Sequence, residues 1–193
     1  LQDIISFTVV GQAKDILIEY AGKATESEIL SMYEHKTARY TIDGPLQLGV
    51  ILAGGSSDLA DAFGRYAIPL GIAFQIQDDI LGVFGSEEEV GKPIGSDIEE
   101  GKISLLVSRA LARASDDVRR ELSEILRKGT ALSRSDINRF REILVESGAL
   151  SSSQDTAKTY INAGKQEILP IAFPAEAKDF LVGIADYMMN REY

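Results

Sequence analysis

The residues from Phe74 to Lys102, FQIQDDILGVFGSEEEVGKPIGSDIEEGK, carry the features that most restrict the fold and function of this sequence. Two adjacent aspartates, Asp78 and Asp79, stand in an apolar run of helical character, and a segment punctuated by glycines and lysines follows. Carboxylates in apolar surroundings are costly unless they are paired or bind metal, and hard oxygen ligands favour Mg²⁺. The lysines add compact positive charges for an anion. We therefore predict a site for a divalent cation and a highly charged anion, with diphosphate as the leading candidate.

The sequence on both sides of this stretch is helical in character. Residues 57–79 are typical of one long helix that passes Pro69, and apolar residues recur at helical spacing from Leu1 to Gly22. Thr25-Glu26-Ser27-Glu28 is a capping box, which predicts a helix that Pro45 kinks or restarts. Further helices are predicted over about 46–53, 104–115, 117–128, 135–146, 152–169 and 174–190, with a loop over 85–101. No run alternates with a period of two for long enough to require a strand, so we predict an all-α fold.

Composition limits the class of protein. The chain has 193 residues with 45% apolar residues, which predicts a single domain over 1–193 with a buried core. Its formal net charge is −10 and it has no dense basic run, so we expect no nucleic-acid partner. The longest uncharged runs, 44–57 and 66–77, are shorter than the ~20 residues that span a bilayer, so no transmembrane segment is predicted. The absence of cysteine excludes thiolate chemistry and fits a cytoplasmic protein.

Paired aspartates often lie at a solvated helix end, and the chain contains such a pair for comparison. Asp116-Asp117 stands among serine, arginine and glutamate and is predicted to be exposed, whereas the neighbours of Asp78-Asp79 are apolar. Gln75 lies one turn before Asp78-Asp79 on the same helical face, although a lone glutamine there would usually be a satisfied core amide. Lys36, on another apolar helix, more often would reach solvent than bind a ligand, so by itself it does not indicate a site.

Four sequence elements, taken in order, resemble the trans-type polyprenyl diphosphate synthases, which include the farnesyl and geranylgeranyl diphosphate synthases. Gly11-Gln12-Ala13-Lys14-Asp15 resembles the Gly-Gln-x-x-Asp helix of that family, and Lys36-Thr37 with the Pro45, Gly49 and Ala53-Gly54 that follow resembles its Lys-Thr helix. Residues 74–79, then Gly91-Lys92 and Asp97-x-x-x-Gly101-Lys102, resemble its second aspartate-rich region. The motif-bearing resemblance covers residues 11 to about 106, and residues 107–193 share only the helical pattern.

The resemblance implies an isoprenoid-synthase-type helical bundle with a central cavity and Mg²⁺ as its cofactor. It also implies a prenyltransferase reaction, in which isopentenyl diphosphate adds to an allylic diphosphate and diphosphate is released. Carried over by position, Asp78 and Asp79 would bind Mg²⁺, Lys36, Lys92 and Lys102 would contact the diphosphate, and Thr37 and Gln75 would direct oxygen dipoles toward an allylic carbocation.

Two departures from the family pattern qualify this prediction. Gly82 stands where the family often has the third acid of Asp-Asp-x-x-Asp, and the first aspartate-rich motif belongs upstream of Gly11, where residues 1–10 contain only Asp3 as an acid. We therefore expect the C-terminal portion of a synthase, a partial bundle without its N-terminal helices and inactive alone. Apolar surface left without cover should favour self-association, with a homodimer as the expected form.

The main alternative is a non-catalytic partner subunit of a heteromeric prenyl diphosphate synthase. Retention of Lys36, Gln75 and the Asp78-Asp79 pair argues against it, because such a subunit has no use for these residues. A terpene cyclase shares the implied fold, but the Gly-Lys segments favour chain elongation. A purely structural helical bundle leaves the order of the four elements unexplained.

Overall fold

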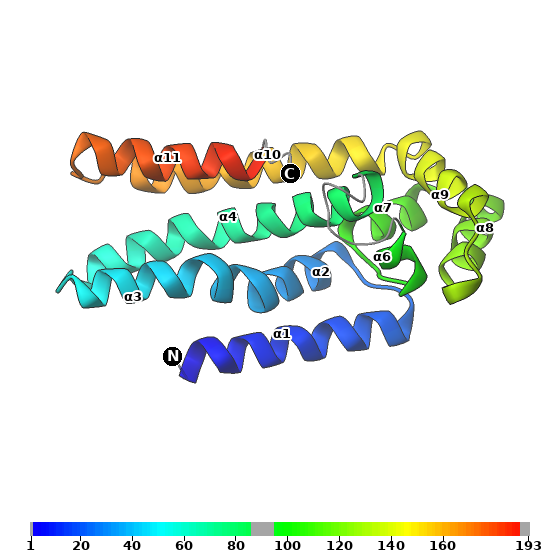
Figure 1. Cartoon of the computed structure of the whole chain (residues 1–193), viewed down its shortest axis with the longest axis horizontal. Helices are drawn as coiled ribbons and strands as arrows, with labels where there is room; N and C mark the ends of the chain where they lie inside the picture. The colour runs from blue at the N-terminus through cyan, green and yellow to red at the C-terminus, as the bar shows by residue number, and fades with distance from the viewer. Residues whose placement is uncertain (1, 86–94, 190–193) are drawn as a thin grey trace.

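The computed structural model describes residues 2–85 and 95–189, and every regular element in these ranges is helical. Figure 1 shows three layers, with α1 (Gln2–Ala21) at the bottom and α10 (Ala149–Ile168) and α11 (Ala175–Met189) at the top. The middle layer holds α2 (Glu26–Tyr33), η1 (Glu34–Asp43), α3 (Gly44–Leu52) and α4 (Ser57–Phe84). One end is closed by α6 (Ser96–Glu99), α7 (Leu105–Arg113), α8 (Asp116–Leu126), η2 (Gly129–Ala131) and α9 (Arg134–Glu146). The predicted all-α fold is confirmed.

The central element is α4, which packs against η1 on one side and against α10 on the other. It begins after Ser56, whose hydroxyl accepts a hydrogen bond from the N–H of Leu59 at 3.2 Å, and it continues through Pro69 as predicted. Among the described residues, α4 alone is long and apolar enough to cross a membrane by length and composition. A core helix passes the same test, and half of its most apolar window is buried. The absence of a transmembrane segment therefore stays a prediction.

Serine and threonine side chains cap the starts of five α-helices among the described residues. Thr25 and Glu28 form the predicted capping box, in which the threonine hydroxyl accepts from the N–H of Glu28 at 3.3 Å and the glutamate accepts from the N–H of Thr25 at 2.8 Å. Ser104, Ser115 and Ser133 likewise cap α7, α8 and α9. These side chains satisfy N–H groups that have no partner within the helix, so the helix starts were predictable from sequence.

The expectations for two connecting segments need correction. Pro45 does lie at the start of a new α-helical segment, Gly44–Leu52, but the ten residues before that segment, Glu34–Asp43, form a π-helix that was not predicted. Proline has no N–H to donate to the preceding turn, and the wider π-helix is a known accommodation within a long helix. The predicted loop over 85–101 contains a short helix at Ser96–Glu99, beyond a left-handed turn at Gly95 with φ +87°.

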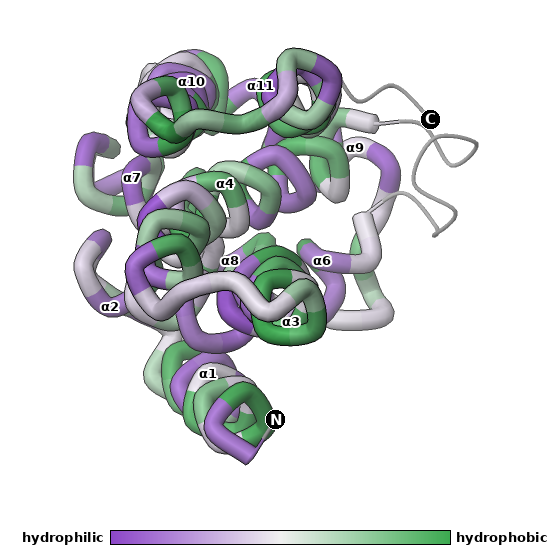
Figure 2. Tube along the Cα trace, turned by 90° about the vertical axis from the view of Figure 1, so that its left-hand side faces the viewer, coloured by the Kyte–Doolittle hydropathy of each residue, from purple (hydrophilic) through white to green (hydrophobic). Residues whose placement is uncertain are grey.

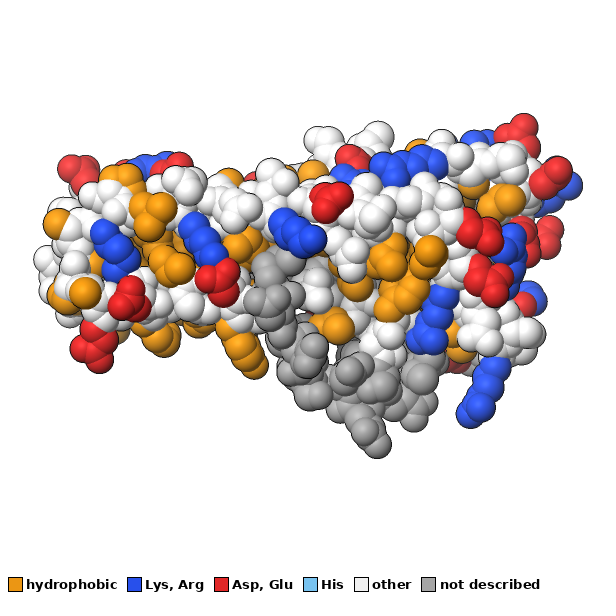
Figure 3. Space-filling model, turned by 90° about the horizontal axis from the view of Figure 1, so that it is seen from above, with side chains coloured by type: hydrophobic (Ala, Val, Ile, Leu, Met, Phe, Trp, Pro, Cys, Tyr) orange, Lys and Arg blue, Asp and Glu red, His pale blue; other side chains and the backbone are white. Residues whose placement is uncertain are grey.

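Buried apolar side chains form one cluster that runs from Ile18 in α1 to Ala185 in α11. The helix α1 contributes only a narrow face to it, with Gly11, Asp15 and Ile18 buried. Its predicted apolar face exists but points away from the bundle, so that Ile5, Val9, Ile16, Leu17 and Tyr20 are all more than half exposed. The end-on view in Figure 2 shows α1 at the lower edge of the molecule, with the other helices on one side of it only. The view from above in Figure 3 shows that the opposite surface, over α10 and α11, carries charged residues of both signs scattered between apolar ones.

Candidate active site

Asp79 is the centre of a buried hydrogen-bond network. Its side chain is 1% exposed, and its Oδ1 accepts hydrogen bonds from Lys102 Nζ at 2.8 Å and Gln75 Nε2 at 3.0 Å. Its Oδ2 accepts from the hydroxyl of Tyr33, and the same hydroxyl oxygen accepts from the N–H of Leu105 at 2.9 Å. Both carboxylate oxygens therefore have donors, which is the condition for keeping a buried charge.

The charges in this network determine which groups carry protons. Burial raises the pKa of the Asp79 carboxyl, while the Lys102 charge and the hydrogen bonds from Lys102, Tyr33 and Gln75 oppose that rise. Burial by itself would lower the pKa of Lys102, but the charges of Asp79 and Asp97 outweigh it and raise that pKa. Burial, followed by the charge of Asp79, holds the pKa of Tyr33 well above its ordinary value. At neutral pH Lys102 is therefore an ammonium and Tyr33 a neutral donor.

The network continues from α4 into the π-helix. Thr37 donates its hydroxyl hydrogen to Gln75 Oε1 at 2.6 Å, and the other end of the same amide donates to Asp79. Thr37 is buried, and its only hydroxyl hydrogen is used in this bond. The lone pairs on the Thr37 oxygen therefore remain available to accept a hydrogen bond. The negative charge of Asp79 polarises the hydrogen bonds from Gln75 to Thr37, which makes the Thr37 oxygen a stronger acceptor.

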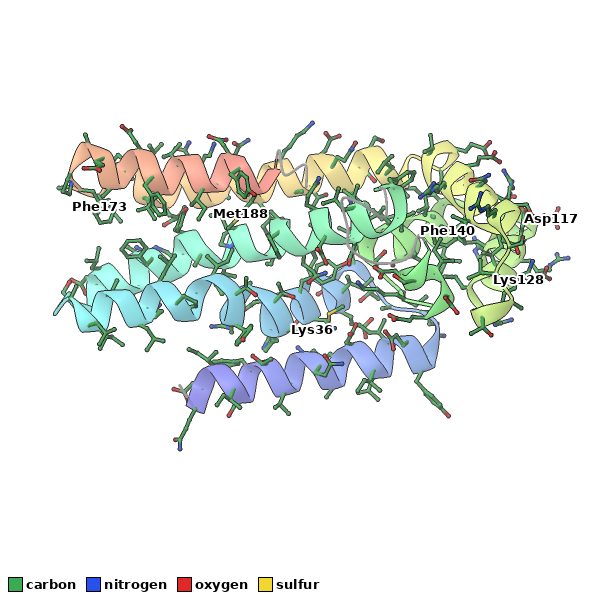
Figure 4. All side chains as sticks on the ribbon, in the orientation of Figure 1. Lys36, Asp117, Lys128, Phe140, Phe173 and Met188 are labelled. Carbon is green, nitrogen blue, oxygen red and sulfur yellow. The ribbon has the colours of Figure 1, made fainter. Side chains whose placement is uncertain are left out.

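Lys36, the neighbour of Thr37, belongs to a separate ion pair. Its ammonium contacts Asp15 of α1, whose carboxylate is buried while the Lys36 side chain is 32% exposed. Figure 4 shows Lys36 between the middle layer and α1. A Cβ at Gly11 would lie 2.3 Å from the backbone N of Lys36, and one at Gly71 would lie 2.3 Å from the Cα of Ala38. Only glycine allows α1 and α4 to approach the π-helix this closely. The contact at Gly11 thereby sets the position of the Lys36 backbone relative to α1.

The two aspartate pairs differ as predicted from sequence. The Asp116 and Asp117 side chains are 90% and 92% exposed and pair with arginines one turn on, Arg119 and Arg120. Figure 4 places Asp117 at the outer edge of the closed end, far from Lys36. Asp79 is buried, and Asp78 is half-buried beside it on α4. Only one pair therefore belongs to the interior of the bundle.

Gly82, where the family often has a third acid, faces another carboxylate. A Cβ at Gly82 would lie 2.7 Å from Asp97 Oδ2 and 3.2 Å from Asp97 Cγ. The same Asp97 oxygen accepts a hydrogen bond from Lys102 at 3.2 Å. From the sequence, Asp97 was noted only as part of a motif and Tyr33 was not predicted as a site residue. Tyr33 follows the spacing of an aromatic residue on the apolar face of a helix, so nothing in its neighbours indicates a polar role.

The predicted site residues thus fall into three groups. Thr37, Gln75, Asp79 and Lys102 share one network, Lys36 is held by Asp15, and Asp78 lies beside Asp79 on α4. Lys92 lies outside the described residues. Within 2–85 and 95–189 no three histidine, cysteine or acidic side chains are arranged closely enough to hold a metal ion by themselves. The predicted ligand roles therefore stay predictions, although the carboxylate oxygens present are of the type that Mg²⁺ prefers.

The chain is similar to known prenyl diphosphate synthases over nearly its whole length. The profile of the Polyprenyl synthetase family matches residues 1–144. A geranylfarnesyl diphosphate synthase of Aeropyrum pernix is 35% identical over 182 residues, which are 94% of this chain and 55% of that protein. A short chain isoprenyl diphosphate synthase of Methanothermobacter thermautotrophicus is 37% identical over 183 residues, 95% of this chain and 55% of that protein.

A solved structure gives the same result. The geranylgeranyl pyrophosphate synthase of Corynebacterium glutamicum, complexed with isoprenyl diphosphate and magnesium, superposes with a TM-score of 0.90 and 34% identity, over 98% of this chain and 53% of that one. The chain thus spans about half the length of the relatives it matches, and the implied isoprenoid-synthase-type fold is confirmed. From the profile, the relatives and the fold together, the chain belongs to the Polyprenyl synthetase family.

Proposed function

We propose that this chain supplies one wall of the active site of a prenyl diphosphate synthase. The reaction would join isopentenyl diphosphate to an allylic diphosphate and release diphosphate, as the names of the relatives suggest. The observation that carries the proposal is the network from Thr37 through Gln75 and Asp79 to Lys102, which gathers four of the predicted site residues from three separate segments. A structural core has no need for so many buried polar groups.

The lysines would bind the diphosphate group. An ammonium has three N–H donors. Among the described residues, Lys102 donates one hydrogen bond to Asp79 and one to Asp97, so the third N–H could bind a phosphate oxygen. Lys36 donates to Asp15 and retains more capacity, because its side chain is partly exposed. Positive groups held in this way stabilise the negative charge that develops as the diphosphate departs. We assign the same role to Lys92 from its sequence position alone.

For the metal, the geometry favours Asp78 over Asp79. Both oxygens of Asp79 already accept hydrogen bonds, and a cation there would have to displace Lys102 or Tyr33. Asp78 stands on the same helix with greater exposure. Mg²⁺, when bound, would neutralise charge on the leaving diphosphate. Asp79 would then act by holding Lys102 and Gln75 in place.

Thr37 and Gln75 would stabilise the positive charge on the allylic carbon. The Thr37 hydroxyl is oriented by its bond to Gln75, so that its oxygen presents lone pairs rather than a hydrogen. A preorganised dipole of this kind costs no reorganisation during the reaction. We propose no protein group as the final base, because the released diphosphate can accept the proton.

Incorporation of labelled isopentenyl diphosphate with an allylic diphosphate and Mg²⁺ tests the proposal. We propose that the complete protein containing these 193 residues is a cytoplasmic homodimer. That protein should convert the two substrates to product, whereas residues 1–193 alone should not. Asp78→Asn should lower kcat in the complete protein, while the paired control Asp116→Asn should not. Turnover by residues 1–193 alone contradicts the proposed division of the site. No turnover by the complete protein, with activation of a separate synthase on mixing, favours the partner-subunit alternative.

A further inference from the structure

Tyr33 lies where three elements of the candidate site meet. It is the last residue of α2, and its side chain is fully buried. Its hydroxyl donates to Asp79 Oδ2, and the same oxygen accepts from the N–H of Leu105 at 2.9 Å. One phenol thus uses both its hydrogen and a lone pair, and it joins α2 to α4 and to the first residue of α7.

Tyr66 shows what a buried phenol in this core does when it serves packing alone. It lies on α4, is 1% exposed, and donates its hydroxyl hydrogen to the backbone carbonyl of Leu181 at 2.6 Å. That single bond satisfies the donor, which is all that burial requires. The need to satisfy a buried hydroxyl therefore explains Tyr66, but it does not explain why Tyr33 bonds to a carboxylate and to a second element as well.

The bond to Leu105 also concerns Lys102, which precedes it by three residues. The N–H of Lys102 donates to the carbonyl of Asp97 at 3.0 Å and the N–H of Leu105 donates to Tyr33, so residues 102–105 are held at both ends. The Lys102 ammonium contacts Asp79 Oδ1 at 2.8 Å, whereas Tyr33 bonds to Oδ2. Tyr33 therefore holds both the carboxylate that Lys102 contacts and the backbone from which Lys102 extends.

We propose that Tyr33 is a positioning residue of the diphosphate site, which fixes the Lys102 ammonium relative to Asp79. This inference rests on the proposed function, because Tyr33 acts through the lysine assigned there to diphosphate. When a ligand competes for the N–H groups of Lys102, Asp79 retains hydrogen bonds from Tyr33 and Gln75. A buried carboxylate is costly without donors, so these two neutral donors let Lys102 turn toward the ligand without leaving Asp79 unpaired.

The competing explanation is that the Tyr33 hydroxyl contributes to stability alone. Tyr33→Phe and Tyr66→Phe each remove a hydroxyl from a buried hydrogen bond, so both variants should unfold at a lower urea concentration than the wild type. Loss of stability therefore does not separate the two explanations. They differ in whether the affinity for diphosphate depends on the hydroxyl, and in whether that dependence requires Lys102.

The experiment is calorimetric titration of the 193-residue chain with inorganic diphosphate in excess Mg²⁺. Tyr33→Phe should weaken binding about tenfold, the lower end of the range known for residues that orient the groups of a site. The matched control Tyr66→Phe should bind as the wild type does. Lys102→Gln should itself bind more weakly, and adding Tyr33→Phe to it should change the affinity by less than about twofold, because the group that Tyr33 positions is then absent.

A second measurement retains the hydroxyl and so does not depend on the folding of Tyr33→Phe. Tyrosine is replaced by 3-fluorotyrosine at position 33, or at position 66 as the control, and ¹⁹F spectra are recorded before and after Mg²⁺ and diphosphate are added. The resonance from position 33 should shift, because Lys102 changes its contact with the Asp79 carboxylate to which Tyr33 donates. The resonance from position 66 should stay in place.

The outcomes separate this inference from the proposed function. Wild-type affinity in Tyr33→Phe, an equal loss in Tyr66→Phe, or an undiminished loss in the Lys102→Gln background overturns the role of Tyr33 and leaves the diphosphate site standing. If circular dichroism shows that Tyr33→Phe is unfolded, an unchanged ¹⁹F resonance from position 33 overturns it instead. No binding of diphosphate by the wild-type chain overturns the proposed function together with the inference.

Discussion

Tyr33 donates its phenolic hydrogen to Asp79, 46 positions later in the chain, and neither side chain is more than 1% exposed. This bond connects α2 to α4 at the depth where Lys102 and Gln75 also meet Asp79. The N–H of Leu105 donates to the same phenolic oxygen, so the start of α7 is attached to the same point. The position of the network thus depends on a residue outside the family motifs that the sequence displays.

Tyr33→Phe should change how stability depends on alkaline pH. The pKa of Tyr33 is raised by burial and by Asp79, so the native state keeps a proton that the unfolded chain releases near pH 10. The free energy of unfolding therefore falls as pH rises above 10, by about 1.4 kcal/mol per pH unit for one proton. Lys102, whose pKa is also raised, contributes with the same sign.

Urea unfolding from pH 9 to pH 11 measures this dependence. The slope in Tyr33→Phe should be shallower than in the wild type by about one proton, with Tyr20→Phe, at an exposed position, as the matched control. An identical slope in Tyr33→Phe and the wild type contradicts the assignment of the proton to Tyr33.

Gln75→Leu should destabilise the protein by about 1–3 kcal/mol. The substitution leaves the buried Thr37 hydroxyl without its acceptor and removes one donor from Asp79, and unsatisfied buried polar groups cost about this much. Gln77→Leu, two residues on and half-buried without a hydrogen bond to the described residues, is the control. In a double-mutant cycle with Thr37→Val, the coupling measured by urea unfolding should be about 0.5–3 kcal/mol. Strictly additive effects contradict the hydrogen bond between Thr37 and Gln75.

Gly11→Ala should destabilise the chain and weaken diphosphate binding through Lys36. The new methyl group would lie 2.3 Å from the Lys36 backbone nitrogen, so α1 and η1 must separate, at an overpacking cost of about 1–3 kcal/mol. Gly49→Ala is the matched control, because nothing lies within 4 Å of its added Cβ, and it should stabilise α3 by about 0.5–1 kcal/mol. Thermal unfolding compares the two variants, and equal effects rule out the close approach at Gly11.

Leu17→Glu should reduce self-association of the chain. Leu17 is 66% exposed on the outward apolar face of α1, and an apolar face of this kind favours contact between copies. Gln12→Glu adds the same charge at an exposed polar position of α1 and serves as the control. Light scattering should show the wild type and Gln12→Glu as dimers or larger species and Leu17→Glu shifted toward the monomer. A monomeric wild type at high concentration contradicts the expectation.

Local features of the fold were predictable because they depend on neighbours in sequence. The caps at Ser104, Ser115 and Ser133, the capping box at Thr25 and the exposure of Asp116-Asp117 all follow from residues within one or two turns. The helical order of the chain follows from the same information. The buried character of Asp79 also follows, since its apolar neighbours are consecutive in the chain.

Features that depend on contacts between distant elements were not predictable. The spacing of apolar residues in α1 indicates a face but not which element covers it, and most of that face proves to be exposed. The close packing of the π-helix depends on Gly11 and Gly71, which approach Lys36 and Ala38 from two other helices and lie far from them in sequence. The meeting of Asp97 with Gly82 requires the turn at Gly95, for which the sequence offers only the glycine itself.

The most direct test of the central claim is calorimetric titration of the 193-residue chain with a non-hydrolysable allylic diphosphate analogue. With Mg²⁺ present we predict binding that disappears when EDTA is added and weakens about tenfold or more in Asp78→Asn. The exposed pair supplies the control, so Asp116→Asn/Asp117→Asn should bind as the wild type does. Binding that is independent of Mg²⁺, or equally weakened by changes at either aspartate pair, would contradict the assignment of this wall to a metal and diphosphate site.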